Sequence, residues 1–221
     1  MKRSILFIFA GLFVFVIAII CIVFLTSHFK NNRINSISLQ KTVNLNVPFT
    51  SQAPGGDWNG IFEHTCEEAS VLMVRHYLIN KKFTSDQNTK QELLDMVNFE
   101  NKKYAFSDVT DAGQTARFTK DYYGYNAKVF YDINLNDIKK EIDSGNPVII
   151  PTAGRLLKNP NYTEPGPQYH MLVIKGYTGS QFITNDAGTK NGADYKYPYA
   201  IIQNAIHDFY TGRSAMIVVT H

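Results

Sequence analysis

The sequence lacks clustered positive charge. Its formal net charge is +3 at pH 7, and its lysines and arginines form no stripe with interleaved aromatic residues. Nothing in this pattern favours a nucleic acid as a partner. Internal repeats and low-complexity blocks are absent as well, while hydrophobic residues make up 44% of the chain, enough for a substantial core. We therefore expect one folded domain with an accessory segment.

Charge is also missing from a long stretch near the N-terminus. The residues from Ile5 to Leu25 include no charged or strongly polar side chain, and they follow Lys2 and Arg3. As a helix rising ~1.5 Å per residue, this stretch would span roughly 30 Å, the thickness of the hydrocarbon core of a bilayer. The pattern predicts a membrane segment, and we assign residues 1–30 to an N-terminal anchor.

A cleaved signal peptide and a lipoprotein signal are the two alternatives to a membrane anchor. A cleaved signal peptide has a shorter apolar run and a small-x-small cleavage site, whereas TSHFK follows Leu25. A lipoprotein would use Cys21, but AII precedes it, without the small residue expected before a lipidated cysteine. An uncleaved signal-anchor is therefore favoured over both.

The flanking charges bear on orientation. Lys2 and Arg3 lie on one side of the segment and Lys30 and Arg33 on the other. The positive-inside rule narrowly favours a cytoplasmic N-terminus. The rest of the chain is then expected outside the cytoplasm, on a single-pass protein of the cell membrane.

Cysteine is scarce, with only Cys21 and Cys66 present. Because Cys21 falls in the expected membrane segment, Cys66 has no partner for an intrachain disulfide. An unpaired thiol in a disulfide-permissive compartment indicates intermolecular pairing or a reactive thiol. A buried cysteine acting as a small hydrophobic residue is the alternative.

Residues 31–42 are polar and rich in Asn and Ser, which is typical of a linker, so the folded domain is expected over residues 43–221. The predicted helices and strands are separated along the chain, helices first and an antiparallel sheet later, which indicates an α+β fold. Helices are expected at 66–79, 90–97, 112–122, 135–144 (with Gly145 as its C-cap) and 201–209, and strands at 43–49, 147–151, 169–177, 182–185 and 215–220.

Cys66 is expected at the start of a helix, with Thr65 as the N-cap and Glu67 and Glu68 in the first turn. A helix N-terminus lowers the pKa of a cysteine because its free N–H groups stabilise the thiolate. The two carboxylates oppose this effect if they point at the sulfur. Activation of the thiol would then also need an imidazole nearby.

His170 opens the apolar run MLVI and is expected on a central strand. A histidine in such a place is more often structural than functional. His64 is close to Cys66 in sequence but precedes the helix, so it is the second choice of base. Asp186 ends the next strand, and a hairpin through Gly179 and Ser180 would place it beside His170, where it could hold the imidazole. It could equally be an ordinary turn aspartate.

Four segments of the chain, read together, resemble the peptidase C39-like family of papain-fold cysteine proteins. The segments are VPFTSQAPGGDW, TCEEASVLMVRHYL, QYHMLVIKGYT and FITNDAGT, in the order glutamine, cysteine, histidine, aspartate. The resemblance implies a papain-like α+β fold with Cys66 as nucleophile and His170 as general base and acid. It further implies Asp186 as the residue that orients the imidazole and Gln52 as an oxyanion donor. No metal or organic cofactor is needed for such chemistry.

The expected function is hydrolysis of a peptide or amide bond through a thioester intermediate, in a peptide or protein substrate. Family members often have Gly-Pro after the cysteine, where this chain has Glu67 and Glu68, and the double-glycine specificity of transporter-linked members is not carried over. Two alternatives stay open: a catalytically silent binding module, and a transglutaminase-like transferase. The Gly/Pro-rich loop 153–167 and the residues Asp57 and Trp58 are each read as cleft wall or as ordinary surface or core, with the ordinary reading favoured for the loop.

Overall fold

The computed structural model describes residues 19–24, 41–104 and 109–221, which fall into two units on either side of the Lys41–Thr42 bond. Residues 19–24 are helical. The remainder of the expected membrane segment, and the expected linker except for its last two residues, lie outside the described residues. Within the described residues, no helix is both long and apolar enough to cross a membrane.

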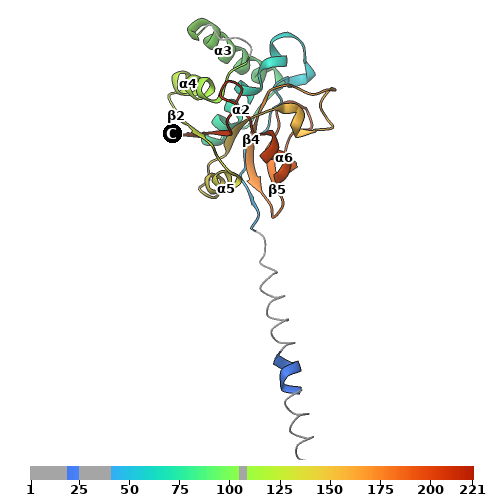
Figure 1. The fold of residues 1–221 in the computed structure, drawn as a ribbon. Helices are drawn as coiled ribbons and strands as arrows, with labels where there is room; N and C mark the ends of the chain where they lie inside the picture. The colour runs from blue at the N-terminus through green and yellow to red at the C-terminus, as the bar shows by residue number, and fades with distance from the viewer. Residues whose placement is uncertain (1–18, 25–40, 105–108) are drawn as a thin grey trace, which may run out of the picture. The chain divides into compact units, whose positions relative to one another are not determined.

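The unit from Thr42 to His221 is built on one antiparallel sheet (Figure 1). The main path of the sheet runs β2-β7-β3-β4-β5-β6, and β1 pairs with β4 beside this path. The strands are β1 (Val43–Asn44), β2 (Asn126–Tyr131), β3 (Val148–Thr152), β4 (His170–Tyr177), β5 (Gln181–Asn185), β6 (Tyr195–Pro198) and β7 (Ala215–Thr220).

The helices precede or interrupt the strands. They are η1 (Pro54–Gly56), η2 (Gly60–His64), α2 (Cys66–Leu78), α3 (Asp86–Tyr104), α4 (Ala112–Tyr123), α5 (Leu135–Asp143), η3 (Gly154–Leu157) and α6 (Tyr199–Ala205). The α+β fold expected from the sequence is confirmed, with the difference that β2 lies between α4 and α5.

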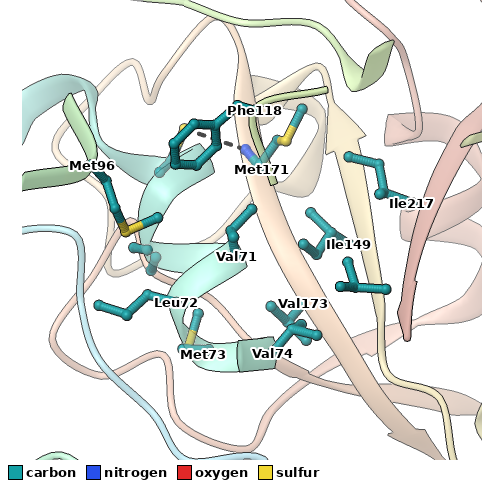
Figure 2. Packing of buried hydrophobic residues seen from close by; sticks show 14 of the residues in the cluster. Val71, Leu72, Met73, Val74, Met96, Phe118, Ile149, Met171, Val173 and Ile217 are labelled. Carbon is teal, nitrogen blue, oxygen red and sulfur yellow. Dashed lines mark hydrogen bonds between the residues drawn. The ribbon is translucent and has the colours of Figure 1, made fainter. Parts of the chain in front are cut away.

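The two faces of the sheet are both covered, so its central strands are buried on both sides. Successive side chains of a strand point to opposite faces. On β4, Met171 and Val173 pack with α2, α3 and α4, whereas Leu172 and Ile174 pack with α5 and α6. Figure 2 shows the first of these cores, with Val71 and Val74 of α2 facing the sheet. This packing fixes the start of α2 against β4.

Several predicted boundaries were wrong. Residues 43–49 form only the two-residue strand β1, and the helix expected at 90–97 is the longer α3. The C-cap of α5 is Ser144 rather than Gly145, which follows it with φ +86°. The helix expected at 201–209 is α6, which ends at Ala205. Strands β2 and β6 were not predicted.

Thr65 precedes α2 as expected, but its side chain does not cap the helix. Its hydroxyl instead donates to the carbonyl of Gln52, 2.9 Å away. The hydroxyl therefore ties the 43–59 segment to the start of α2, which brings Gln52 next to Cys66.

Candidate active site

Cys66 is the first residue of α2 and is buried, with 6% of its surface exposed. Its Sγ donates to Oε2 of Glu67 at 2.9 Å, and the backbone N–H of Met171 donates to the sulfur at 3.5 Å. Since Met171 follows His170 on β4, the thiol lies beside the strand that carries the expected base.

The pKa of the Cys66 thiol is raised well above its usual value, contrary to the expectation from its position at a helix N-terminus. Burial is the largest cause, because a thiolate loses its hydration in the protein interior. The charge of Glu67 and its hydrogen bond with the thiol add to the effect. Of the two carboxylates in the first turn, Glu67 points at the sulfur and opposes formation of the thiolate.

His170 and Asp186 lie together as the hairpin geometry predicted. His170 begins β4 and Asp186 directly follows β5, the strand paired with it. The imidazole Nε2 and the Asp186 Oδ1 are 2.8 Å apart, and both side chains are buried. This bond leaves Nδ1 as the second ring nitrogen available for chemistry.

Asp186 is held by more donors than the sequence indicated. Its Oδ2 accepts from the hydroxyls of Tyr197 at 2.5 Å and Tyr162 at 2.7 Å and from the amide of Asn159 at 3.0 Å. Its Oδ1 also accepts from the backbone N–H of Gly188 at 3.0 Å. None of the three side chains was assigned a role from sequence, because a tyrosine or asparagine distant along the chain carries no local signal.

These contacts determine the charge of Asp186. Burial alone would raise the pKa of a carboxyl, but the charge and hydrogen bond of His170, together with the two tyrosine hydroxyls, lower the pKa of Asp186 to about 2. The carboxylate is therefore ionised throughout the neutral range. An ionised, immobile partner favours an imidazole with its proton on Nε2.

Gln52 lies close to the same site. Its backbone N–H donates to the carbonyl of Ala187, one residue after Asp186, and its side-chain nitrogen donates to the carbonyls of Phe62 and Glu63. The expected oxyanion donor is thus brought into the site, with both amide hydrogens directed at η2 in this structure.

A cavity of about 400 Å³ brings these groups together. Gln52, Cys66, His170 and Gly188 line it, and its walls are Trp58, Glu63, Tyr162, Thr163, Gly166, Pro167 and Tyr169. The loop 153–167 therefore borders the cleft, and the favoured reading of it as an ordinary surface loop was wrong. Trp58 both lines the cavity and packs on the core, whereas Asp57 pairs with Lys90.

A second cavity, of about 320 Å³, also reaches Cys66. It is lined by Glu63, His64, Cys66, Glu67, Val109, Pro167, Gln168, Tyr169 and Phe209. His64, the second choice of base, lies here and is exposed, without the buried carboxylate that accompanies His170. The geometry therefore favours His170 over His64 as the candidate base.

One expected contact is not formed. Within the described residues, the hydrogen bonds of the Cys66 sulfur are with Glu67 and Met171, and the imidazole of His170 is not among its partners. The two side chains line the same cavity, however, and His170 Nδ1 is not engaged by Asp186.

Three glutamates form a buried cluster next to the thiol. Glu67 and Glu68 come from the first turn of α2 and Glu100 from α3, and Glu68 and Glu100 hydrogen bond to each other. Burial and the neighbouring carboxyls raise the pKa of Glu67 to about 8 and that of Glu100 to about 11. The cluster carries protons at neutral pH. In the described residues no group of three or more His, Cys, Asp and Glu is arranged to hold a metal ion.

Replacing Glu100 by glutamine is expected to stabilise the protein by about 4 kcal/mol more at pH 8 than at pH 5. In the unfolded chain this carboxyl ionises above pH ~4.3, but in the folded protein its pKa is raised to about 11, so it keeps its proton. Its stability contribution is therefore full below pH ~4 and is lost as the pH rises through that window. Glutamine does not ionise, so it causes no such loss of stability with rising pH. Urea unfolding at the two pH values measures the difference.

The exposed Glu164 offers the matched control, and Glu164→Gln should leave the free energy of unfolding unchanged at both pH values. An equal effect of Glu100→Gln at pH 5 and pH 8 would show that Glu100 is not protonated in the folded state.

Comparison with solved structures identifies the class of fold. A C39-like peptidase from Bacillus anthracis, so described from its crystal structure, superimposes with a TM-score of 0.56 at 20% sequence identity, covering 82% of this chain and 98% of that chain. Residues 44–215 match the sequence profile of the Peptidase_C39 like family, so the chain belongs to that family. No curated protein matches the chain. The resemblance seen in the sequence is confirmed.

Proposed function

We propose that this protein is a membrane-anchored cysteine peptidase or amidase that hydrolyses a peptide or amide bond outside the cytoplasm. The observation that carries the enzymatic part is the convergence of Cys66 and the His170–Asp186 pair on one cavity. Membership of a peptidase family agrees with a peptide substrate.

In the proposed reaction, His170 Nδ1 takes the proton of the Cys66 thiol, and Asp186 stabilises the resulting imidazolium through Nε2. The thiolate attacks the carbonyl carbon and the tetrahedral intermediate places its oxyanion near the backbone N–H of Cys66, at the start of α2. Gln52 supplies a second donor once one of its amide hydrogens leaves η2. The imidazolium protonates the leaving amine, and water then hydrolyses the thioester.

The shape of the site supports a substrate that extends on both sides of the scissile bond. The two cavities meet at Cys66, Pro167 and Tyr169, and both are lined by Glu63. A peptide passing over the thiol would occupy one cavity with its acyl side and the other with its amine side. We therefore expect cleavage of internal bonds.

A catalytically silent binding module is the main competing function. The resting thiol, bonded to Glu67 and not to His170, is the observation that favours it. Against it stands the support of Asp186 by five hydrogen bonds, from His170, Gly188, Asn159, Tyr162 and Tyr197. A pocket that only binds has no use for an imidazole held so firmly in one orientation.

The anchored arrangement is proposed from the sequence. Residues 1–30 form the anchor, 31–42 a linker and 43–221 the catalytic domain, with the apolar run from Ile5 to Leu25 as support. Membrane fractionation, with protease added to intact and to permeabilised cells, tests the location. Release of the domain from intact cells would agree with the proposal, and protection until permeabilisation would contradict it.

The test of the reaction is incubation of the full chain in detergent with a mixture of peptides, followed by mass spectrometry. Hydrolysis in H₂¹⁸O should place one heavy oxygen on the new carboxyl end of an internal fragment. An amine-linked product instead would identify a transferase. Intact peptides recovered in complex with the protein would identify the silent binding module.

Gly188→Ala is expected to lower kcat/KM by 10- to 100-fold, because it displaces the proposed base. A Cβ at this position would lie 2.9 Å from Cε1 of His170 and 3.0 Å from Cε1 of Tyr162, closer than side chains tolerate. The imidazole would have to move by several tenths of an ångström. Turnover of a peptide identified above, measured at equal folded fraction, checks the loss.

Gly113→Ala is the control, since a Cβ there meets side-chain atoms of Asp111 and Tyr131 at 3.3 Å or more. It should keep full turnover. If Gly188→Ala did so as well, the position of the imidazole would not limit the reaction.

A further inference from the structure

Glu67 is a buried carboxyl that the proposed reaction does not use. It is 4% exposed, and both of its oxygens are engaged. Oε2 accepts from the Cys66 thiol at 2.9 Å, and Oε1 accepts from the backbone N–H of Thr110 at 3.1 Å. Thr110 is fixed in turn by the Tyr169 hydroxyl, which donates to its carbonyl at 3.0 Å. The carboxyl is therefore held against the nucleophile by an element distant in sequence.

The groups around Glu67 are mostly acidic. Cys66 and Glu68 face it from α2, Glu100 from α3, and Tyr169 from the segment before β4. Glu63 and His64 of η2 line the cavity into which it opens. Burial first, and then the charge of Glu68, raise the pKa of Glu67 to about 8. Around neutral pH the group is a carboxylic acid, which can donate a hydrogen bond as well as accept one.

We propose that protonated Glu67 donates a hydrogen bond from its O–H to the thiolate of Cys66, and that its ionised form instead accepts a hydrogen bond from the intact thiol and so holds the nucleophile in its unreactive form. Glu67 is thus a positioning residue for the peptidase reaction, and this inference rests on the proposed function.

The proton balance gives the direction of the effect. At neutral pH the thiol proton moves to His170, and Glu67 keeps its own proton and shares it with the sulfur. Because the acid is uncharged, it stabilises the thiolate without repelling it. Above its pKa, Glu67 releases that proton to solvent, and its negative charge favours the thiol over the thiolate. Cys66 should therefore lose reactivity as the pH rises, the opposite of an ordinary thiol.

The measurement is the rate of alkylation of Cys66 by iodoacetamide in the full chain in detergent, from pH 5.5 to 10, followed by mass spectrometry. We expect the wild-type rate to fall at least five-fold between pH 7 and pH 9.5. Glu67→Gln keeps an N–H donor near the sulfur and has no proton to lose, so its rate should stay level or rise over the same range. Glu141→Gln, on the opposite face of the sheet, should keep the wild-type profile.

Glu68→Gln is a second variant that keeps the test open if Glu67→Gln does not fold. Removing the charge of Glu68 lowers the pKa of Glu67, so the fall in alkylation rate should move to lower pH. A wild-type rate that rises steadily with pH, or profiles unchanged in Glu67→Gln and Glu68→Gln, would overturn the inference.

Alkylation reports the thiolate and not turnover, so the two proposals can fail separately. Absence of peptide cleavage together with the predicted profiles would remove the peptidase function and leave the Glu67–Cys66 pair. Cleavage with unchanged profiles would remove only the role of Glu67.

Discussion

Replacement of Cys66 by serine is expected to lower kcat/KM for peptide cleavage by at least 10⁴-fold. The serine hydroxyl ionises at a far higher pH than the thiol, and the structure places an acidic neighbour, Glu67, beside it rather than an additional base. The loss should be in kcat, since the cavity walls that bind the peptide are unchanged. Steady-state cleavage of a peptide found in the mixture measures both constants.

Serine is nearly isosteric with cysteine and can donate the same hydrogen bond to Glu67, so the variant should fold. Cys21→Ser is the matched control, because it removes the other cysteine of the chain and lies in the expected anchor. It should retain full activity in detergent. Cleavage by Cys66→Ser at a tenth of the wild-type rate would show that the thiol is not the nucleophile.

The sequence predicted those helices, strands and turns whose own residues show a clear periodic or turn-forming pattern. The start of α2 and the central strand β4 follow from helical spacing and from the run HMLVIKGY, and the hairpin turn placed Asp186 beside His170. Strands β2 and β6 were missed because NAKVFY and YKYP are short, partly exposed and carry polar residues within them. Their place is set by pairing with β7 and β5, which lie far along the chain or beyond a turn.

The chemistry of the site was less predictable than its location. Whether Thr65 caps α2 depended on the carbonyl of Gln52, which competes for its hydroxyl. The raised pKa of Cys66 depended on how deeply the thiol is buried and on the rotamer of Glu67. Both are properties of tertiary packing. The position of Cys66 at a helix N-terminus, taken alone, therefore predicted a lowered pKa, whereas the pKa is raised. The tyrosines that surround Asp186 could not be predicted either, because tertiary packing brings them to the carboxylate.

Asp186→Asn is expected to reduce kcat by 10² to 10⁴-fold while KM changes little. The carboxylate accepts the Nε2–H of His170 and so keeps Nδ1 free to take the thiol proton. An asparagine amide donating to Nε2 would place the ring proton on Nδ1 instead, which blocks the base. Peptide cleavage over a range of pH measures the loss, which higher pH should not restore.

The same substitution should also alter the stability of the fold, because five donors would face a neutral amide. The pKa of Asp186 is about 2 in the folded protein, below the ~3.9 of an unfolded chain. The wild type therefore gains about 3 kcal/mol that is present above pH ~4 and is lost as the pH falls toward 2. In Asp186→Asn this acid-sensitive part of the unfolding free energy should be absent.

Asp208→Asn separates the two effects. Asp208 is also fully buried and accepts from the backbone N–H of Ala112 and the hydroxyl of Thr211, outside the cleft. Its replacement should destabilise the fold yet preserve kcat at a temperature where the variant remains folded. If Asp186→Asn kept the wild-type kcat at matched folded fraction, as Asp208→Asn should, Asp186 would act through stability alone. A loss confined to Asp186→Asn would assign it the orientation of the imidazole, because only that carboxylate determines which nitrogen of His170 is free to accept a proton.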